Sequence, residues 1–430
     1  MGCNLQVLKQ HFPQRLHSYI VFVLTKYFSR NPVSPLSIFI PCFNSLPKPL
    51  LPAVVFQVLS NHTKMTGRFY SFLISLFSYL GYRLLCNRAT LCNKQIFLDI
   101  RNNYYRRYLY TFLKYFQLEG YTVYLPARLR LYHRVRQDKY SALLLKEKIV
   151  HFGKPSPKAN LMIIDEMQLS PDYFSGLPPT VNRFYVPMPQ HPLMYHKKFW
   201  NQSLVFPYRR KKSVIMAGNF DNSYNRLQKE NLFNILSRLE VQQFLSAKER
   251  LFDINSADGL TAFLGQPEDG KIILLNRQIA DIPLGDLRKM LCRFDFFFAL
   301  PGVAMPYCHN IVEAMSVGVI PFIQQAYANL FIPALTDGVN AITFQDETDL
   351  LSRINYMLNL PDFEIRRLRK NVLDHYRTYF TPSAVVRQIE QSPHARIFLQ
   401  ASEFSVDLFK KNCSAAKNRV RYTHHFSKQP

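Results

Sequence analysis

The chain of 430 residues is too long for one ordinary core, and its 48% hydrophobic content predicts a packed protein of two domains. Its formal net charge of +25 attracts anions such as phosphates, nucleic acid or anionic lipids. No zinc-finger, RNP or basic-zipper pattern accompanies this charge, so no nucleic acid partner is expected. The seven Cys include no C-x-x-C pair, which argues against a disulfide framework and a structural zinc site.

The uncharged segment 69–82 is shorter than the roughly 20 residues that span a bilayer, so it predicts a buried or interfacial helix. With this cysteine usage it favours a cytoplasmic protein that lies at most peripherally on a membrane. The basic charge is densest in residues 101–148, with eleven Lys and Arg against three acids. This segment is either a solvated basic face or a surface for anionic lipid or an acidic acceptor.

Residues 1–93 form an N-terminal extension of uncertain structure, because prolines recur in it, and its one predicted helix covers 67–80. From residue 94 short apolar runs alternate with helical periodicity, which is typical of βαβ units and a parallel sheet. A first Rossmann-like domain is expected over 94–205. Its predicted strands cover 95–100, 121–126, 148–152, 161–165 and 183–187, and its first helix covers 109–116.

A second domain over 206–382 repeats this alternation, so the predicted fold class is α/β with two Rossmann-like domains facing a cleft. The basic segment 383–430 is less patterned and is expected to be partly disordered. In the second domain the predicted strands cover 213–217, 271–275, 294–300, 319–324 and 342–344, and the predicted helices 232–239, 287–291, 310–317, 350–358 and 364–379.

The most informative stretch is 297–321, which reads as a buried strand, a Pro-Gly loop, a helix, a Gly stop and another strand. Ligands of open α/β sheets bind outside the carboxyl ends of the strands, and a helix start favours a diphosphate. Asn310 is a predicted N-cap, with Glu313 three residues on as in a capping box. Alternatively, the Glu313 carboxylate reaches a pair of sugar hydroxyls.

Glu313-Ala-Met, followed by Gly318 and Pro321, resembles the nucleotide-sugar motif of GT-B glycosyltransferases, most closely that of the exostosin-like families. The resemblance covers about 210–380, and 94–205 only in layout. It implies that Glu313 binds the ribose, that the second domain holds the donor and the first the acceptor, and that no metal or other cofactor is needed. The chain departs from the pattern at Met305, where retaining relatives often have a second Glu, and at Asn310, where exostosin-like members usually have Arg.

Further candidates follow the ends of predicted strands. On the donor side a diphosphate contact is expected from His309, Arg277 or backbone N–H groups, and a close backbone approach at a glycine. On the acceptor side, a carboxylate at a strand end is a candidate general base, although such a residue is more often a turn or cap residue. The remaining donor-side candidates are Gly218, Asn219 and Gly302, and the candidate bases are Asp99, Asp165 and Glu166, with His151 and His191 as weaker ones.

The sequence thus predicts a glycosyltransferase of the hexosyltransferase type, which moves a sugar from a nucleotide sugar to a hydroxyl of a glycan or lipid-linked acceptor. A nucleotide-sugar epimerase on the same fold and a catalytically inactive member that binds glycans or a partner remain as alternatives. Walker, G-x-G-x-x-G and G-x-S-x-G patterns are absent from the sequence, so kinase, dehydrogenase and serine hydrolase functions lose their usual support.

Overall fold

A computed structural model describes residues 67–86, 93–155, 160–175, 182–207, 209–221, 223, 232–303 and 305–426. The chain divides into two compact units, Met1–Phe77 and Ser78–Pro430. In the first unit the described residues, 67–77, form the beginning of helix α4 (Gly67–Cys86), as the sequence predicted. No helix within the described ranges is both long and apolar enough to cross a membrane.

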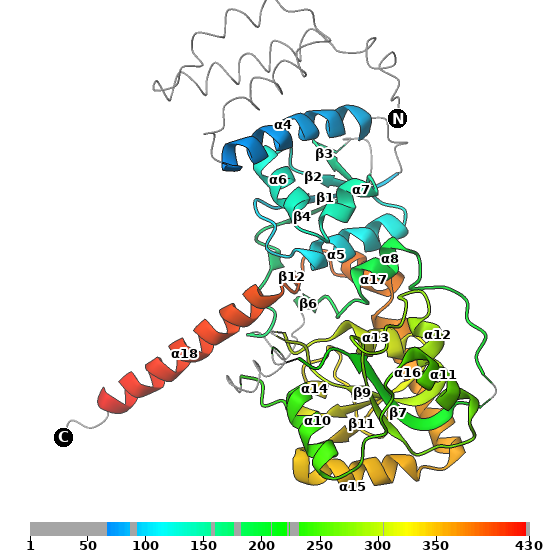
Figure 1. Cartoon of the computed structure of the whole chain (residues 1–430). Helices are drawn as coiled ribbons and strands as arrows, with labels where there is room; N and C mark the ends of the chain where they lie inside the picture. Colours follow the sequence, from blue (N-terminus) through cyan, green and yellow to red (C-terminus); the bar gives the residue numbers. More distant parts are fainter. Residues whose placement is uncertain are drawn as a thin grey trace, which may run out of the picture. The chain divides into compact units, whose positions relative to one another are not determined.

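The second unit begins with a four-stranded parallel sheet in the order β3-β2-β1-β4. Buried apolar residues such as Ile96 and Leu98 fix β1 at its centre. The second half of α4 packs here, with the Tyr79 ring 5.7 Å from that of Phe152, while α5 lies on the other side of the sheet (Figure 1). The elements are β1 (Lys94–Asp99), α5 (Arg107–Leu118), β2 (Thr122–Leu125), α6 (Leu129–Gln137), α7 (Ala142–Lys146), β3 (Val150–Phe152) and β4 (Asn160–Asp165).

A second parallel sheet has five strands in the order β11-β10-β9-β7-β8. Its middle strand, β9, is buried at every residue, because helices cover both faces of such a sheet. The two parallel sheets confirm the α/β class, and the predicted strands agree with the observed ones. The strands are β7 (Lys211–Gly218), β8 (Ile272–Asn276), β9 (Phe294–Ala299), β10 (Ile320–Gln324) and β11 (Ile342–Phe344).

The helix predicted over 232–239 is wrong in its position. Residues 232–237 precede α10 (Arg238–Ala247), because Ser237 and Glu240 form a capping box that sets the helix start. The other helices in the described residues of this half are α11 (Ala257–Gly265), α12 (Leu287–Leu291), α13 (His309–Met315), α14 (Gln325–Ala328), α15 (Glu347–Leu358) and α16 (Asp362–Tyr379).

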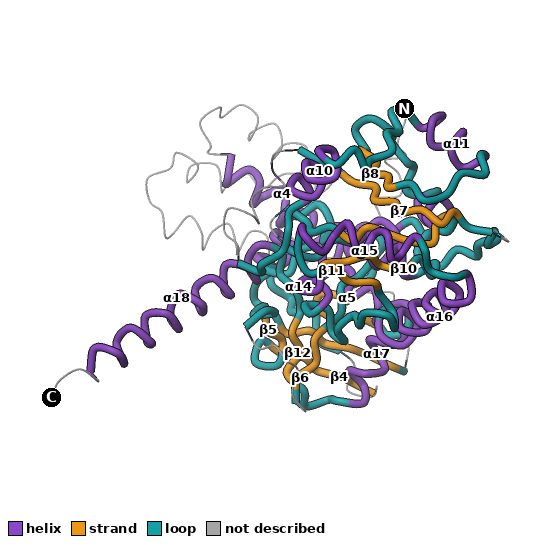
Figure 2. The backbone as a smooth tube through the Cα atoms, turned by 90° about the horizontal axis from the view of Figure 1, so that it is seen from below, coloured by secondary structure: helices purple, strands orange, loops and turns teal. Residues whose placement is uncertain are grey.

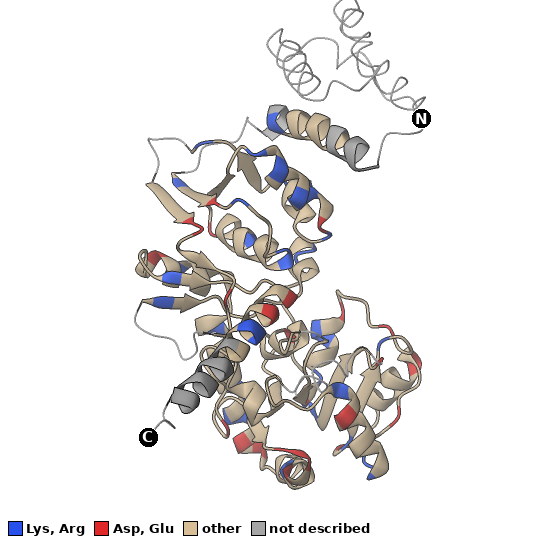
Figure 3. Ribbon diagram, turned by 90° about the vertical axis from the view of Figure 1, so that its left-hand side faces the viewer, with Lys and Arg blue, Asp and Glu red and all other residues tan. Residues whose placement is uncertain are grey.

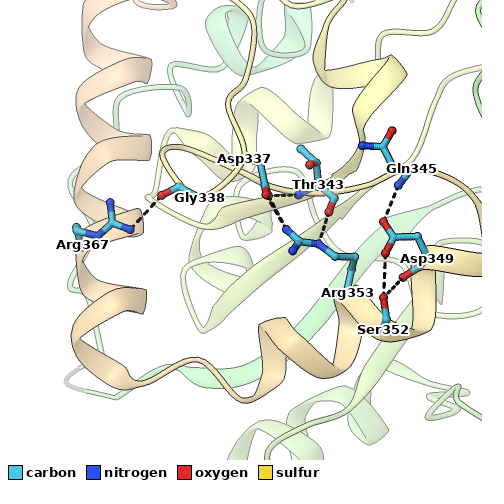
Figure 4. A network of polar contacts seen from close by, with 8 residues as sticks. All are labelled: Asp337, Gly338, Thr343, Gln345, Asp349, Ser352, Arg353 and Arg367. Atoms are coloured by element: carbon cyan, nitrogen blue, oxygen red, sulfur yellow. Dashed lines mark hydrogen bonds and ion pairs between the residues drawn. The ribbon is translucent and has the colours of Figure 1, made fainter.

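An arginine fixes the last strand of this sheet to its helix (Figure 4). The two Arg353 Nη2 contacts to Asp337 measure 2.7 and 2.8 Å, and Arg353 Nε donates to the Thr343 carbonyl at 2.6 Å. Asp337 also accepts from the Thr343 N–H at 2.8 Å. The loop before β11, the strand and α15 are therefore held as one piece.

The chain returns to its first half after α16. Helix α17 (Pro382–Gln391) packs against α5. Strand β12 (Arg396–Phe398) then lies between β5 (Leu169–Ser170) and β6 (Arg183–Tyr185) in a parallel three-stranded sheet (Figure 2). The sequence pattern after residue 383 predicted little regular structure, whereas this segment contains β12 and α18 (Glu403–Phe426).

We expect Ile397→Ala in β12 to lower the free energy of unfolding by about 2 to 5 kcal/mol, because the side chain is 2% exposed and its removal leaves a cavity. Ile163→Ala in β4, where the side chain is 55% exposed, is the matched control and should change it by less than about 0.5 kcal/mol. Denaturant unfolding measures both. Equal losses in the two variants contradict a structural role for the C-terminal strand.

Candidate functional site

The candidate site lies at the carboxyl edge of the second sheet, where β7, β8 and β9 end. The strand order reverses between β7 and β9, and ligands of doubly wound sheets bind at this switch point. Gly218 ends β7, Arg277 follows β8, and the loop 300–308 follows β9. The Arg277 N–H donates to the Gly218 carbonyl at 3.0 Å, which ties two of these ends together.

Two glycines allow the loops to pass closely at this edge. A Cβ on Gly302 would lie 2.6 Å from the Met305 carbonyl oxygen and 3.0 Å from that of Tyr307, both of them backbone atoms. A Cβ on Gly218 would lie 2.8 Å from Nη1 of Arg238. The loop after β9 therefore has space for glycine alone at residue 302.

Arg238 at the start of α10 joins the loops that follow β7 and β9. Its side chain is buried, with Nε donating to the Pro301 carbonyl at 2.7 Å and Nη1 to the Asn219 carbonyl at 2.9 Å. Nη2 lies 3.0 Å from the Cys308 sulfur. Asn219 thus contributes its carbonyl to the site, and Arg238 is a residue that sequence reasoning missed.

The capping box predicted for α13 is wrong. The helix begins at His309 with Cys308 as its N-cap, so Asn310 lies inside the first turn. The Asn310 amide instead donates to the carbonyl of Ala217 on β7 at 2.9 Å, and its oxygen accepts from the Cys308 thiol. Asn310 therefore links α13 to β7 at the switch point and does not cap the helix.

Glu313 is a buried carboxylate that faces the first half of the unit. Its exposed fraction is 3%, and Oε1 accepts from the His191 backbone N–H at 3.0 Å. Burial raises the pKa of Glu313 to about 7, against the lowering effect of that hydrogen bond and of the Arg277 and Arg288 charges. A carboxyl group that titrates near neutrality at a strand-end edge is typical of a functional site.

Two imidazoles adjoin Glu313, with ring centroids 5.3 Å apart. His309 donates from Nδ1 to the Pro189 carbonyl at 2.9 Å, so its Nε2 accepts from Nη1 of Arg107 at 3.3 Å. His191 accepts at Nδ1 from the Leu193 N–H, so its Nε2 donates to the Tyr140 hydroxyl at 3.2 Å. Burial lowers the pKa of His191 to about 4 and that of His309 well below its usual value, so both rings are neutral.

The charges around His191 are cationic. Arg107, Lys139 and Arg277 all lower its pKa in addition to burial. Arg277 is paired with Asp281 at 3.1 Å, and its Nε is buried with no hydrogen-bond partner within the described part of the chain. Arg107 and Lys139 are further residues that the sequence did not indicate, since nothing local sets them apart from other surface cations.

The three predicted bases lie at the edge where β1 and β4 end, with Asp99 paired in register with Asp165. Asp165 accepts from two backbone N–H groups, of Met167 and Gln168, and so closes a turn. Glu166 contacts the backbone and the guanidinium of Arg101. Asp99 makes an ion pair of 3.5 Å with Arg128. No group of three or more potential metal ligands occurs among the residues that the structure describes.

No protein-family model matches the chain, and no curated protein matches it. Among solved structures, HepE of Anabaena in complex with UDP is 12% identical, with a TM-score of 0.34 over 70% of this chain and 99% of HepE. A glycosyltransferase of Rickettsia africae is 10% identical, with a TM-score of 0.33 over 70% of this chain and 97% of that one. The spinosyn rhamnosyltransferase SpnG is 12% identical, with a TM-score of 0.30 over 69% and 100%.

We expect the free energy of unfolding of the Glu313→Gln variant to increase relative to that of the wild type as pH rises. The folded-state pKa is raised above the unfolded value, so the wild type loses stability between about pH 4.5 and 7, while Gln does not titrate. Between pH 5 and pH 8 the difference should grow by about 2 to 3 kcal/mol in favour of Gln.

Denaturant unfolding at the two pH values measures this difference. Glu249→Gln, which changes an exposed carboxylate of the same half, is the control and should show no such growth. A Glu313→Gln difference that is constant with pH rules out the raised pKa.

Proposed function

We propose that the chain is a glycosyltransferase of the GT-B type, which moves a hexose from a nucleotide-sugar donor to a hydroxyl of a glycan or lipid-linked acceptor. The observation that carries the proposal is the buried Glu313 carboxylate at the switch point of the second sheet, within the influence of two arginine charges. A carboxylate offers acceptors to the two hydroxyls of a ribose, and cations beside it suit the diphosphate of the same ligand.

In this proposal the second sheet holds the donor. Glu313 accepts from the ribose hydroxyls; its Oε1 already accepts from the His191 N–H, and Oε2 offers a second acceptor. Arg277 meets the diphosphate, with its buried Nε free to donate. Gly302 and Gly218 lie where the loops pass closely at this edge, and we assign both to the close backbone approach of the donor.

Sugar transfer then requires that the charge on the leaving diphosphate be offset and that the acceptor hydroxyl lose its proton. We assign the first task to Arg277 and its cationic neighbours, and include no metal or other cofactor in the proposal. For the second we favour Asp99 over Asp165 and Glu166, because the other two carboxylates hold backbone N–H groups. Neither imidazole suits this task, since both rings use both nitrogens in hydrogen bonds.

The proposal extends to a cytoplasmic enzyme that works at an anionic membrane surface. Helix α6 carries Arg130, Arg134 and Arg136 without an acidic residue, and all three are exposed. Figure 3 colours the Lys and Arg residues blue along the ribbon. Each such cation near an anionic bilayer contributes on the order of 1 kcal/mol of attraction. This surface would bring the first sheet to a lipid-linked acceptor.

We expect one member of a panel of nucleoside diphosphates to bind the wild type and to bind Glu313→Ala at least about tenfold more weakly, because two hydroxyls lose a charged acceptor. Calorimetric titration measures the affinity, and thermal unfolding confirms that the variant is folded. Glu249→Ala, an exposed carboxylate of the same half, is the matched control and should keep wild-type affinity.

If no nucleoside diphosphate binds to the folded wild type, the enzyme proposal fails and a glycan-binding or partner-binding role takes its place. If a nucleotide binds, incubation with the matching nucleotide sugar decides the reaction. Release of free nucleotide with a glycosylated product supports transfer, whereas an isomerised nucleotide sugar identifies an epimerase.

A further inference from the structure

Two cations of the first half lie beside the proposed donor site. Arg107 is the first residue of α5, and its Nη1 lies 3.3 Å from Nε2 of His309 on α13. Lys139 lies between α6 and α7, with its Nζ 5.4 Å from the centroid of the Tyr140 ring. The Tyr140 hydroxyl in turn accepts from His191, whose backbone N–H binds Glu313. Arg107 is thus linked to Glu313 through the neighbouring rings of His309 and His191. Lys139 is linked to it through Tyr140 and His191.

Neither of these two cations is paired with an acid among the described residues. Within the described ranges neither Arg107 nor Lys139 forms an ion pair, whereas Arg277 on the other side is paired with Asp281. The polar partner of Arg107 is an imidazole, which is neutral here. Asp138, next to Lys139, accepts at Oδ1 from the backbone N–H groups of Tyr140 and Ser141 and forms no ion pair with Lys139 in the described ranges. The Arg107 guanidinium and the Lys139 ammonium are therefore available to an anionic ligand on the side of the first sheet.

The position of the two cations assigns them to the acceptor side. Arg107 follows the loop that leaves β1, and Lys139 follows α6, which leaves β2. Both segments thus start from the carboxyl edge of the first sheet, where its ligand is expected. Arg277 and Glu313 belong to the second sheet, so each sheet brings its own charged side chains to the site.

From this arrangement we propose that Arg107 and Lys139 form a subsite for an anionic group, a carboxylate, sulfate or phosphate, which the acceptor carries near its reactive hydroxyl. This inference rests on the proposed function and narrows its acceptor to an acidic sugar or a phosphorylated one. Guanidinium and ammonium groups form charge-assisted hydrogen bonds with such anions, and a neutral acceptor would leave both cations without a counter-charge.

The test compares two sugars that differ in one carboxylate, 4-nitrophenyl β-D-glucuronide and 4-nitrophenyl β-D-glucoside. Calorimetry measures their binding to the protein saturated with its nucleoside diphosphate, so that the donor site is already filled. We expect the wild type to bind the glucuronide at least about tenfold more tightly, the effect of one charge-assisted hydrogen bond. The double variant Arg107→Gln, Lys139→Gln should lose this preference.

A variant with the same change of net charge, Lys146→Gln with Lys148→Gln, is the matched control, because both side chains are exposed at the end of α7 and just after it. It should keep the preference. The inference is overturned if the wild type fails to prefer the glucuronide, including the case in which it binds neither sugar. It is equally overturned if the Arg107, Lys139 variant instead weakens nucleoside diphosphate binding, since the cations then serve the donor. In both of those cases nucleotide binding persists in the wild type, whereas its absence is the separate failure of the proposed function.

Discussion

The parallel direction of every strand in the two larger sheets is the constraint on which the site depends. Parallel strands end at one edge, so the loops after β7, β8 and β9 must meet there, and the carbonyls at and just beyond the strand ends need partners other than a neighbouring strand. Arg238 and Asn310 supply them, by donating to Asn219, Pro301 and Ala217. The same side chains that satisfy the strand ends therefore also set the shape of the edge.

The site keeps ionisable groups in an environment that disfavours their charged forms. Glu313 holds a pKa near 7 with one backbone N–H and two more distant cations, and two histidines stay neutral beside it. An apolar side chain of similar size would be the simpler solution if packing were the sole requirement. A ligand that donates further hydrogen bonds to the carboxylate would offset the energetic cost of burying it.

The sequence predicted well the strands and helices that a local pattern of residues determines. The run 294–300 is apolar except for Asp295, which predicts a buried strand, and the observed strand, Phe294–Ala299, agrees. The start of α10 was misplaced although its signal was present, because the apolar spacing of 232–239 was given more weight than the Ser237 and Glu240 pair. In that case the hydrogen bonds of the cap, and not the apolar period, set the boundary.

Other parts of the site depend on contacts that no local pattern encodes. Arg107 and His309 are 202 residues apart, and Asn310 and Ala217 are 93 residues apart. Asn310 is a good N-cap residue by type, yet its amide is used by a strand that lies elsewhere in the sequence. Glu313 was singled out from its motif, but its partner at His191 and its burial follow from tertiary packing alone.

The return of the chain through α17 and β12 interleaves the two halves of the unit along the sequence. The strand that separates β5 from β6 is encoded after the whole second sheet, so neither half ends where the other begins. A donor half from another protein could not be exchanged by joining two gene fragments end to end. It would have to replace an internal segment with both of its junctions matched. The two halves are therefore inherited together.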